Sequence, residues 1–280
     1  MRFLTDSAAD YEWDQLEQSN IDFVPVRVYF GEEEFPLQDK DFKARFYEKM
    51  RTEKAFPHTS QPSPQDYLPF FEDVKEKGES LIAVLLSSAL SGTYQSALLA
   101  KDMVDYDNIH IVDSRSVSVG IQILVDKAQR MHKNGESAKK IAHELSFLLK
   151  RIRVLAIIDN LDNLYRGGRL SRMQVNIGKL AHLKPIIMLS PQGKIEVQGR
   201  YMGRNKADTT LLNLLEEDGF DPEYGLNFVY AENRDNCDRM IEKAKDRFGE
   251  ETIKGVTHIG PTIGAHVGFR AYGIFYVVHE

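Results

Sequence analysis

The sequence predicts an α/β protein with two α/β domains, the first built on a parallel sheet with helices on both faces and the second on a mixed sheet. Apolar runs of strand length, such as residues 81–86, alternate with segments of helical period. Unbroken apolar runs are typical of strands that are covered on both faces. A hairpin is expected within residues 185–198, which brings antiparallel pairing into the second half of the chain.

The length and composition limit the classes of protein. At 280 residues and 32.0 kDa the chain can form two cores, and we place the domains at residues 1–155 and 156–280. With 36 Lys and Arg against 42 Asp and Glu, the net charge of -6 provides no basic field, so no nucleic-acid partner is expected. The single cysteine, Cys237, excludes an internal disulfide and fits a reducing compartment.

No segment resembles a membrane anchor. The N-terminus lacks the apolar core of a signal peptide, and no run approaches the roughly 20 apolar residues of a membrane span. We therefore expect a cytoplasmic protein that makes at most transient contact with a membrane.

The first elements can be assigned from local patterns. A short strand at residues 2–5 ends in Asp6 and Ser7, and a second strand is expected over residues 24–30, with Pro25 confining its start to an edge or a strand end. Apolar residues at helical spacing predict a helix over residues 41–50.

A well-marked helix start follows. Ser63 is a favourable N-cap, Pro64 suits the first helical position, and Asp66 lies in the first turn. Thr59 and Ser60 are therefore expected on the loop before this helix. Pro69 falls inside it and removes a backbone hydrogen bond, which predicts a kink or a tightened first turn.

The central stretch, residues 81–97, changes from strand to helical period. Ser91 is the expected N-cap of the helix, with Gly92 and Thr93 in its first turn. The free backbone amides and the dipole at such a helix start favour an anion. Serine also caps helices that bind nothing, so both interpretations stay open here.

The pattern of a strand, polar residues at its end and a following helix occurs once more. A strand at residues 109–112 precedes Asp113 and Ser114, and helices are expected to about residue 133 and from Ser137 to about residue 151. The carboxyl ends of parallel strands meet at one edge of a sheet, where ligands lie. Polar residues after three strands would gather there, although polar turns at strand ends are also common.

The second half begins with a buried strand at residues 153–158. Residues 160–171 predict a short helix, a Gly-Gly break and a second helix capped by Ser171, with Arg166, Arg169 and Arg172 forming a positive corner. The hairpin pairs residues 185–190 with 194–198, and helices near 206–217 and 235–248 surround a strand at 226–231.

A glycine-rich segment precedes the last strand. Residues 256–273 contain four glycines around His266, and a buried strand follows at residues 274–278. Glycines let a backbone approach another surface closely, which a loop with no partner would not require. A lone histidine is more often a core or surface residue than a ligand contact, but this setting makes His266 a candidate.

Several short motifs together resemble the DegV family. They occur in order over nearly the whole chain: Thr5-Asp-Ser7, Thr59-Ser-Gln-Pro-Ser63, Leu90-Ser-Gly-Thr-Tyr-Gln-Ser96, Val112-Asp-Ser114, Gly167-Gly-Arg169 and Gly260-Pro-Thr-Ile-Gly-Ala-His266. Each motif is weak alone, but the order and spacing are specific. The resemblance implies two α/β domains with a long-chain fatty acid bound between them. It also implies delivery of the acyl carboxylate to a separate fatty-acid kinase subunit, with no catalytic residue, cofactor or metal in this chain.

The resemblance carries over to individual positions. By their place in the motifs, Thr59, Ser91 and His266 would hold the carboxylate. The adjacent candidates are Ser60, Gly92 and Thr93, and the contacts to a partner or a gating helix are Arg169 and Arg172. The chain departs from the family pattern after His266, where bulky Phe269 and charged Arg270 would affect the wall of an acyl tunnel.

Elementary energetics agree with such a ligand. Burying a methylene contributes about 0.8 kcal/mol, so a chain of roughly sixteen carbons supplies on the order of 10 kcal/mol. A hydrogen bond to a charged group adds about 1.5–3 kcal/mol. The tail should dominate the affinity, and the polar residues should fix and recognise the carboxylate.

Four other interpretations remain. Asp113 lies about twenty residues beyond Gly92, as a ribose-binding acid can in a nucleotide-binding protein, but the turn lacks G-x-G-x-x-G. Ser91 and His266 could serve a hydrolase, although the serine is not in a G-x-S-x-G elbow. A metal site at His258 and His266 has the least support, because the two are eight residues apart without an H-E-x-x-H motif. An interaction protein with an empty cleft is the fourth.

Overall fold

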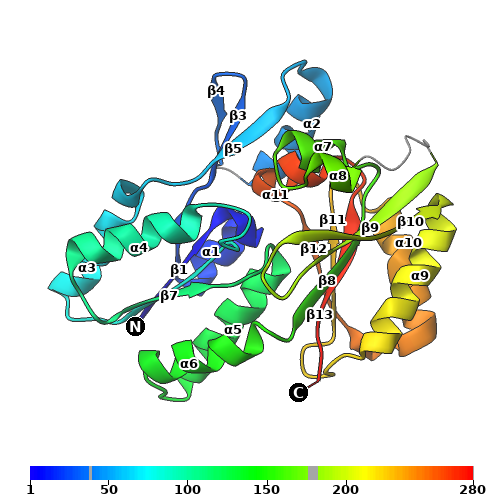
Figure 1. The fold of residues 1–280 in the computed structure, drawn as a ribbon. Coiled ribbons are helices and arrows are strands. Elements are labelled where there is room, and N and C mark those ends of the chain that lie inside the picture. Colours follow the sequence, from blue (N-terminus) through cyan, green and yellow to red (C-terminus); the bar gives the residue numbers. More distant parts are fainter. Residues whose placement is uncertain (38–39, 176–181, 280) are drawn as a thin grey trace.

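The computed structural model describes residues 1–37, 40–175 and 182–279. Its architecture is α/β with a parallel sheet, a mixed sheet and a small antiparallel sheet (Figure 1). The predicted fold class is therefore confirmed. None of the helices within the described ranges is long and apolar enough to cross a membrane.

The N-terminal sheet is parallel throughout, in the order β2-β1-β6-β7. Its strands are β1 (Arg2–Asp6), β2 (Ile21–Val24), β6 (Leu81–Leu85) and β7 (Ile109–Asp113). Every residue of β6 is buried, as its apolar run predicts for a central strand. The carboxyl ends of β1, β6 and β7 meet at one edge, as expected from the sequence.

Helices cover both faces of this sheet (Figure 1). They are α1 (Trp13–Ser19), α3 (Leu68–Glu76), α4 (Thr93–Val104), α5 (Val119–Lys133) and α6 (Ala138–Leu148). Alternate residues of β6 divide between the two faces: Leu81 and Ala83 pack with α3 and α4, whereas Ile82 packs with α5 and α6.

The second sheet is mixed, in the order β10-β9-β8-β13-β11-β12. Its strands are β8 (Ile152–Ile157), β9 (Leu183–Leu189), β10 (Ile195–Met202), β11 (Leu226–Tyr230), β12 (Ile253–His258) and β13 (Tyr272–Val277). Only β11 and β12 pair in parallel. The predicted domain boundary between residues 155 and 156 falls within β8, and the division into domains stays a prediction.

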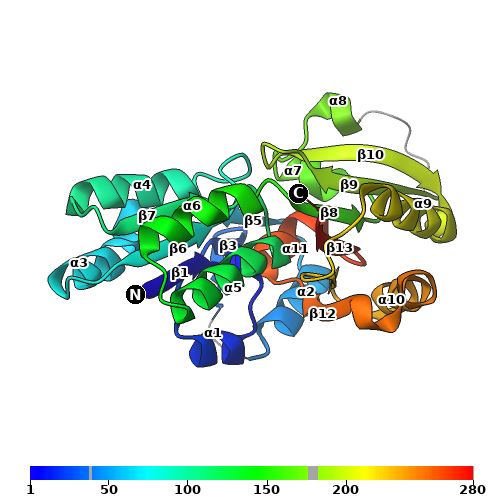
Figure 2. The ribbon, with the colours of Figure 1, turned by 90° about the horizontal axis from the view of Figure 1, so that it is seen from below.

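One face of the mixed sheet packs against α9 (Gly203–Asp218) and α10 (Asp235–Phe248). The other face turns toward the N-terminal part of the molecule (Figure 2). On β8, Leu155 and Ile157 belong to the core with α9 and α10, whereas Val154 and Ala156 face the opposite way. This alternation leaves an apolar inner face between the two large sheets.

A third, antiparallel sheet corrects two predictions. Its order is β4-β3-β5, with β3 (Arg27–Phe30), β4 (Glu33–Phe35) and β5 (Pro57–Ser60). The expected single strand over residues 24–30 is two strands in different sheets, because the chain turns at Pro25, where Ser7 binds the backbone of Val26. Thr59 and Ser60 lie on β5, not on a loop, because they pair with β3.

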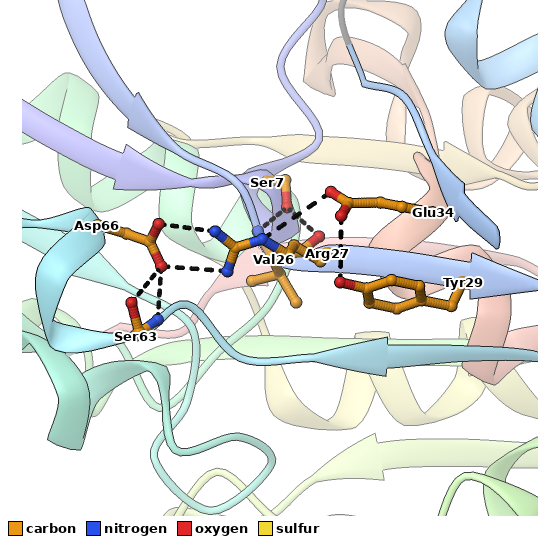
Figure 3. A network of polar contacts seen from close by, with 7 residues as sticks. All are labelled: Ser7, Val26, Arg27, Tyr29, Glu34, Ser63 and Asp66. Atoms are coloured by element: carbon orange, nitrogen blue, oxygen red, sulfur yellow. Dashed lines mark hydrogen bonds and ion pairs between the residues drawn. The ribbon is translucent and has the colours of Figure 1, made fainter. Parts of the chain in front are cut away.

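Polar contacts attach this small sheet to the next turn of the chain (Figure 3). The Arg27 guanidinium donates to both oxygens of Asp66, at 2.7 and 3.1 Å, and Ser63 donates to Asp66 from its backbone and its hydroxyl. The Arg27 guanidinium holds the pKa of Asp66 below its ordinary value. Because Arg27 pairs with Ser60, the network also fixes the end of β5 that carries Thr59.

The remaining elements are short. They are α2 (Phe42–Thr52), α7 (Asp162–Arg166), α8 (Arg172–Val175), α11 (Pro261–Val267) and 3-10 helices at Ser7–Ala9, Pro64–Asp66 and Glu250–Thr252. The 3-10 turn before α3 confirms the tightened turn that Pro69 predicts.

Two local predictions need correction. The N-cap of α4 is Gly92, one residue later than expected, and the Ser91 hydroxyl just before it lies 2.8 Å from the Thr93 hydroxyl and accepts from the Thr93 amide at 3.4 Å. The glycine-rich segment is not a loop around His266, since it forms α11 between β12 and β13.

Candidate functional site

An apolar cavity of about 90 Å³ lies between the carboxyl edge of the N-terminal sheet and the inner face of the mixed sheet. The described residues that line it are Val26, Thr59, Leu86, Leu90, Ser91, Val117, Ser118, Val154, Ala156, Leu164, Arg169, Ile187, Met188, Leu189, Ile195, Val229, Ile259, Thr262, Ile263, His266, Val267 and Phe275. These residues include one cation and no carboxylate. The cavity therefore suits a long apolar group that ends in a polar or anionic head.

Thr59, Ser91 and His266 all line this cavity. The Thr59 hydroxyl and His266 Nε2 are hydrogen-bonded at 2.9 Å, although 207 residues separate them in the sequence. Thr59 comes from β5, His266 from α11 and Ser91 from the loop before α4. Packing of three distant segments thus brings together the residues that the motifs indicate.

The imidazole of His266 is held neutral. Burial, followed by the positive charge of Arg169, lowers the pKa of His266 to about 3. Its Nδ1 is buried without a hydrogen-bond partner. A Cβ atom on Gly167 would lie 2.3 Å from that nitrogen, so only glycine fits beside the ring. No local pattern indicated that the Gly-Gly motif lies against His266.

Arg169 provides the positive charge of the cavity. Its Nε donates to the Leu90 carbonyl at 2.9 Å and its Nη1 to the Gly167 carbonyl at 2.6 Å. Within the described part of the chain no carboxylate pairs with it. Burial lowers the pKa of Arg169, but a guanidinium keeps its proton in proteins. A half-buried cation without a counter-ion favours an anion at this end of the cavity.

The other candidate residues lie elsewhere. Ser60 follows Thr59 on β5, is exposed and is outside the cavity wall, because successive side chains of a strand point to opposite faces. Thr93 is fully buried and its hydroxyl lies 2.8 Å from that of Ser91. Arg172 is exposed at the start of α8. Of the two arginines expected to contact a partner or gate, only Arg169 lines the cavity.

Gly92 is covered by a residue that the sequence did not single out. A Cβ on Gly92 would lie 2.0 Å from the side-chain oxygen of Gln61, whose amide nitrogen donates to Ser96. Gln61 therefore lies across the first turn of α4. It belongs to the Thr-Ser-Gln-Pro motif, which was the only signal that could have identified it.

Three side chains hold the backbone just before α11. Lys43 donates to the His258 carbonyl at 2.8 Å, Tyr47 donates to the Ile259 carbonyl at 3.1 Å, and Asp10 accepts from the Gly260 amide at 2.9 Å. Burial raises the pKa of Asp10 to about 6, against the effect of nearby Lys43. These contacts fix the start of the helix that carries His266.

The residues that depart from the family pattern do not reach the cavity. The Phe269 ring lies 6.2 Å from the Tyr47 ring, centroid to centroid, and outside the cavity wall. Arg270 is exposed and has a left-handed φ of 57°. Val267 occupies the wall in their place.

The described residues do not form the hydrolase, nucleotide-binding or metal sites that were considered as alternatives. Ser91 bonds to Thr93 and His266 to Thr59, so among the described residues no hydrogen bond joins the serine to the histidine as a hydrolase would need. Asp113 accepts from Ser88 and Arg115. In the described ranges, no group of three or more His, Cys, Asp and Glu residues is arranged to hold a metal ion.

Known proteins resemble this chain over its whole described length. Residues 1–279 match the DegV family model, described as "Uncharacterised protein, DegV family". A DegV domain-containing protein of Caldanaerobacter subterraneus is 34% identical over 274 residues, covering 98% of this chain and 97% of that protein.

Two solved structures extend the comparison. One is described as showing fatty acid binding of a DegV family protein from Thermus thermophilus, with a TM-score of 0.88, 26% identity and 99% coverage of both chains. Another is a stearic acid-binding protein from Eubacterium ventriosum, with a TM-score of 0.87, 26% identity and coverage of 99% of this chain and 98% of that one.

Proposed function

This chain belongs to the DegV family, and from that premise we propose that it binds a long-chain fatty acid, such as hexadecanoate, without transforming it. The proposal places the acyl tail in the cavity between the two large sheets and the carboxylate beside Thr59, Ser91 and His266. Relatives of similar fold that are described as fatty-acid-binding proteins support this assignment.

The observation that carries the proposal is the polarity of the cavity. Its wall is apolar, and its one charged side chain, Arg169, has no carboxylate partner within the described ranges. A carboxylate would supply the missing negative charge and accept hydrogen bonds from the two hydroxyl groups. Because the imidazole is neutral, the one of its nitrogens that carries the proton can also donate a hydrogen bond to the ligand.

The carboxylate contacts can be tested by changing the ligand head and one hydroxyl together. We expect Ser91→Ala to weaken binding of hexadecanoate by about 1–3 kcal/mol, or about 5- to 150-fold, and to leave hexadecanol nearly unaffected. The matched control is Ser60→Ala, which removes the same hydroxyl from an exposed position outside the cavity. Titration calorimetry measures both ligands. Equal losses for acid and alcohol would contradict the role of Ser91.

We also infer that the protein presents its fatty acid to a separate acyl kinase. Ser91 and Thr59 are only half-buried, and Ser60 and Gln61 beside them are exposed, so the head of the ligand would lie near the surface. Arg172 at the start of α8 is free to contact such a partner. Replacing Arg172 by alanine should slow acyl phosphate formation by the added kinase and leave the affinity for the fatty acid unchanged. A loss of affinity instead would place Arg172 at the ligand.

A further inference from the structure

The cavity has two distinguishable ends. The end near the hydroxyl groups lies beside α7 and α11, because Leu164 of α7 and His266 of α11 both line it. Strand β8 runs toward that end, since its carboxyl terminus leads into α7. Along β8, Ala156 therefore lies closer to His266, and Val154 lies farther from it.

The neighbouring strands continue this direction. Ile187 of β9 pairs with Ala156, and the next residue on the same face of β9 is Leu189. At about 3.3 Å per residue, Leu189 lies roughly 7 Å farther from the head end than Ile187. Leu189 in turn pairs with Ile195 of β10, which also lines the cavity.

A small recess of about 10 Å³ adjoins this far end. Among the described residues, only Val154 and Leu189 line both the cavity and the recess. Both side chains are half-buried, as expected for residues with the cavity on one side and the recess on the other. The other residues that line the recess include the exposed Arg115 and Lys150, the half-buried Arg153, and the buried Ser116, Ile152 and Ser190.

The hairpin that carries Leu189 is fastened at this end. The Ser87 hydroxyl donates to the Gly193 carbonyl at 2.9 Å, and Ser87 is fully buried. A Cβ on Gly193 would lie 2.9 Å from the Arg115 backbone, so the turn of the hairpin lies directly on the loop after β7. The strand that carries Leu189 is thus fixed at its end, so a longer acyl chain cannot easily move this strand aside.

We propose that Leu189 and Val154 form the end wall of the cavity and determine the longest acyl chain that the protein accepts. The inference rests on the proposed function, because it concerns the tail of the same ligand. In a series of fatty acids of increasing length, each added methylene buries more apolar surface and raises the affinity until the methyl end meets these two side chains. Methylenes beyond that length add no affinity, since they would have to displace a strand that is fixed at its end.

The experiment measures affinity for saturated fatty acids lengthened one carbon at a time. For the unmodified protein, the affinity rises about fourfold for each methylene and stops rising at one chain length. Leu189→Ala moves that limit to chains longer by about two carbons, so that acids beyond the original limit bind about tenfold tighter than before. Circular dichroism verifies the fold, and Val154→Ala is the second variant, with the same expected direction.

The matched control is Ile187→Ala. It removes the same number of carbon atoms from the same face of the same strand, but from the middle of the wall and not its end. It should weaken all chain lengths similarly and leave the limit where it was. An unmoved limit in Leu189→Ala and Val154→Ala, or an equal shift in Ile187→Ala, would overturn the inference alone. Absence of binding at every chain length in the unmodified protein would instead overturn the proposed function.

Discussion

The buried ammonium of Lys43 gives the most informative prediction about how the site is held together. Its side chain is only 3% exposed, and Nζ donates to the carbonyls of Asp10 and His258, both at 2.8 Å, and to Glu12 at 2.7 Å. The perturbation is Lys43→Met, which keeps an unbranched side chain of similar length and removes all three donors.

The expected loss follows from what the three acceptors can do afterwards. The Glu12 side chain is 46% exposed and can bind water, but the Asp10 carbonyl loses its partner in a buried setting and the His258 carbonyl in a partly buried one. An unsatisfied buried acceptor costs about 1–3 kcal/mol, and release of the desolvated ammonium offsets part of the total. We expect a net loss of about 3 kcal/mol, which corresponds to a fall of about 6–12 °C in Tm.

The matched control is the same substitution at Lys243. Its ammonium lies 2.7 Å from the buried Asp208 carboxylate, which also accepts from Arg239 at 3.1 Å and from the Tyr272 hydroxyl at 2.6 Å. Because Asp208 keeps two donors, Lys243→Met should cost only about 1 kcal/mol.

Thermal unfolding followed by circular dichroism measures both variants, and titration with hexadecanoate measures the site. Lys43→Met should also weaken the acid more than the alcohol, because the start of α11 and therefore His266 are no longer fixed. Equal Tm losses in the two variants, or an unchanged preference for the acid in Lys43→Met, would refute this reasoning.

Two further predictions concern His266. Gly167→Ala should weaken hexadecanoate binding about tenfold, because the new methyl group displaces the ring. The control is Gly255→Ala on β12, whose new Cβ would meet only the Asn227 side chain at 3.5 Å and should leave binding unchanged; equal affinities of the two variants in a titration would contradict this. Burial lowers the pKa of His266 to about 3 from an unfolded value near 6.5, so the stability that depends on its neutral form is present above pH 6.5 and is lost as the pH falls toward 3. We therefore compare the free energy of unfolding of the unmodified protein with that of His266→Gln, which does not titrate at this position. Between pH 6.5 and pH 5 the unmodified protein should lose about 2 kcal/mol relative to the variant. A difference between the two proteins that stays constant over this pH range would show that the histidine is not held neutral.

The family and the fold class follow from the sequence because both depend on local pattern. Runs such as residues 81–86 and the helical period after them fix strand and helix whatever lies around them. The motifs likewise indicated Thr59, Ser91 and His266, and these residues do line one cavity.

Where strands pair was decided by the tertiary structure. Thr59 looked like a loop residue because nothing near it in sequence alternates, and only pairing with Arg27–Phe30 makes it part of a strand. The placement of Phe269 against Tyr47 and of Arg169 in the cavity wall is equally invisible in a local pattern.

The sequence by itself therefore determined the longer helices, the buried central strands and the residue types that are available for an acidic ligand. The tertiary structure decided that Thr59 and His266 meet and that Arg169 lies in the same cavity wall, where no carboxylate of the described residues pairs with it. The physical reason is that secondary structure depends on neighbours a few residues away, whereas a site depends on packing between segments as much as 207 residues apart.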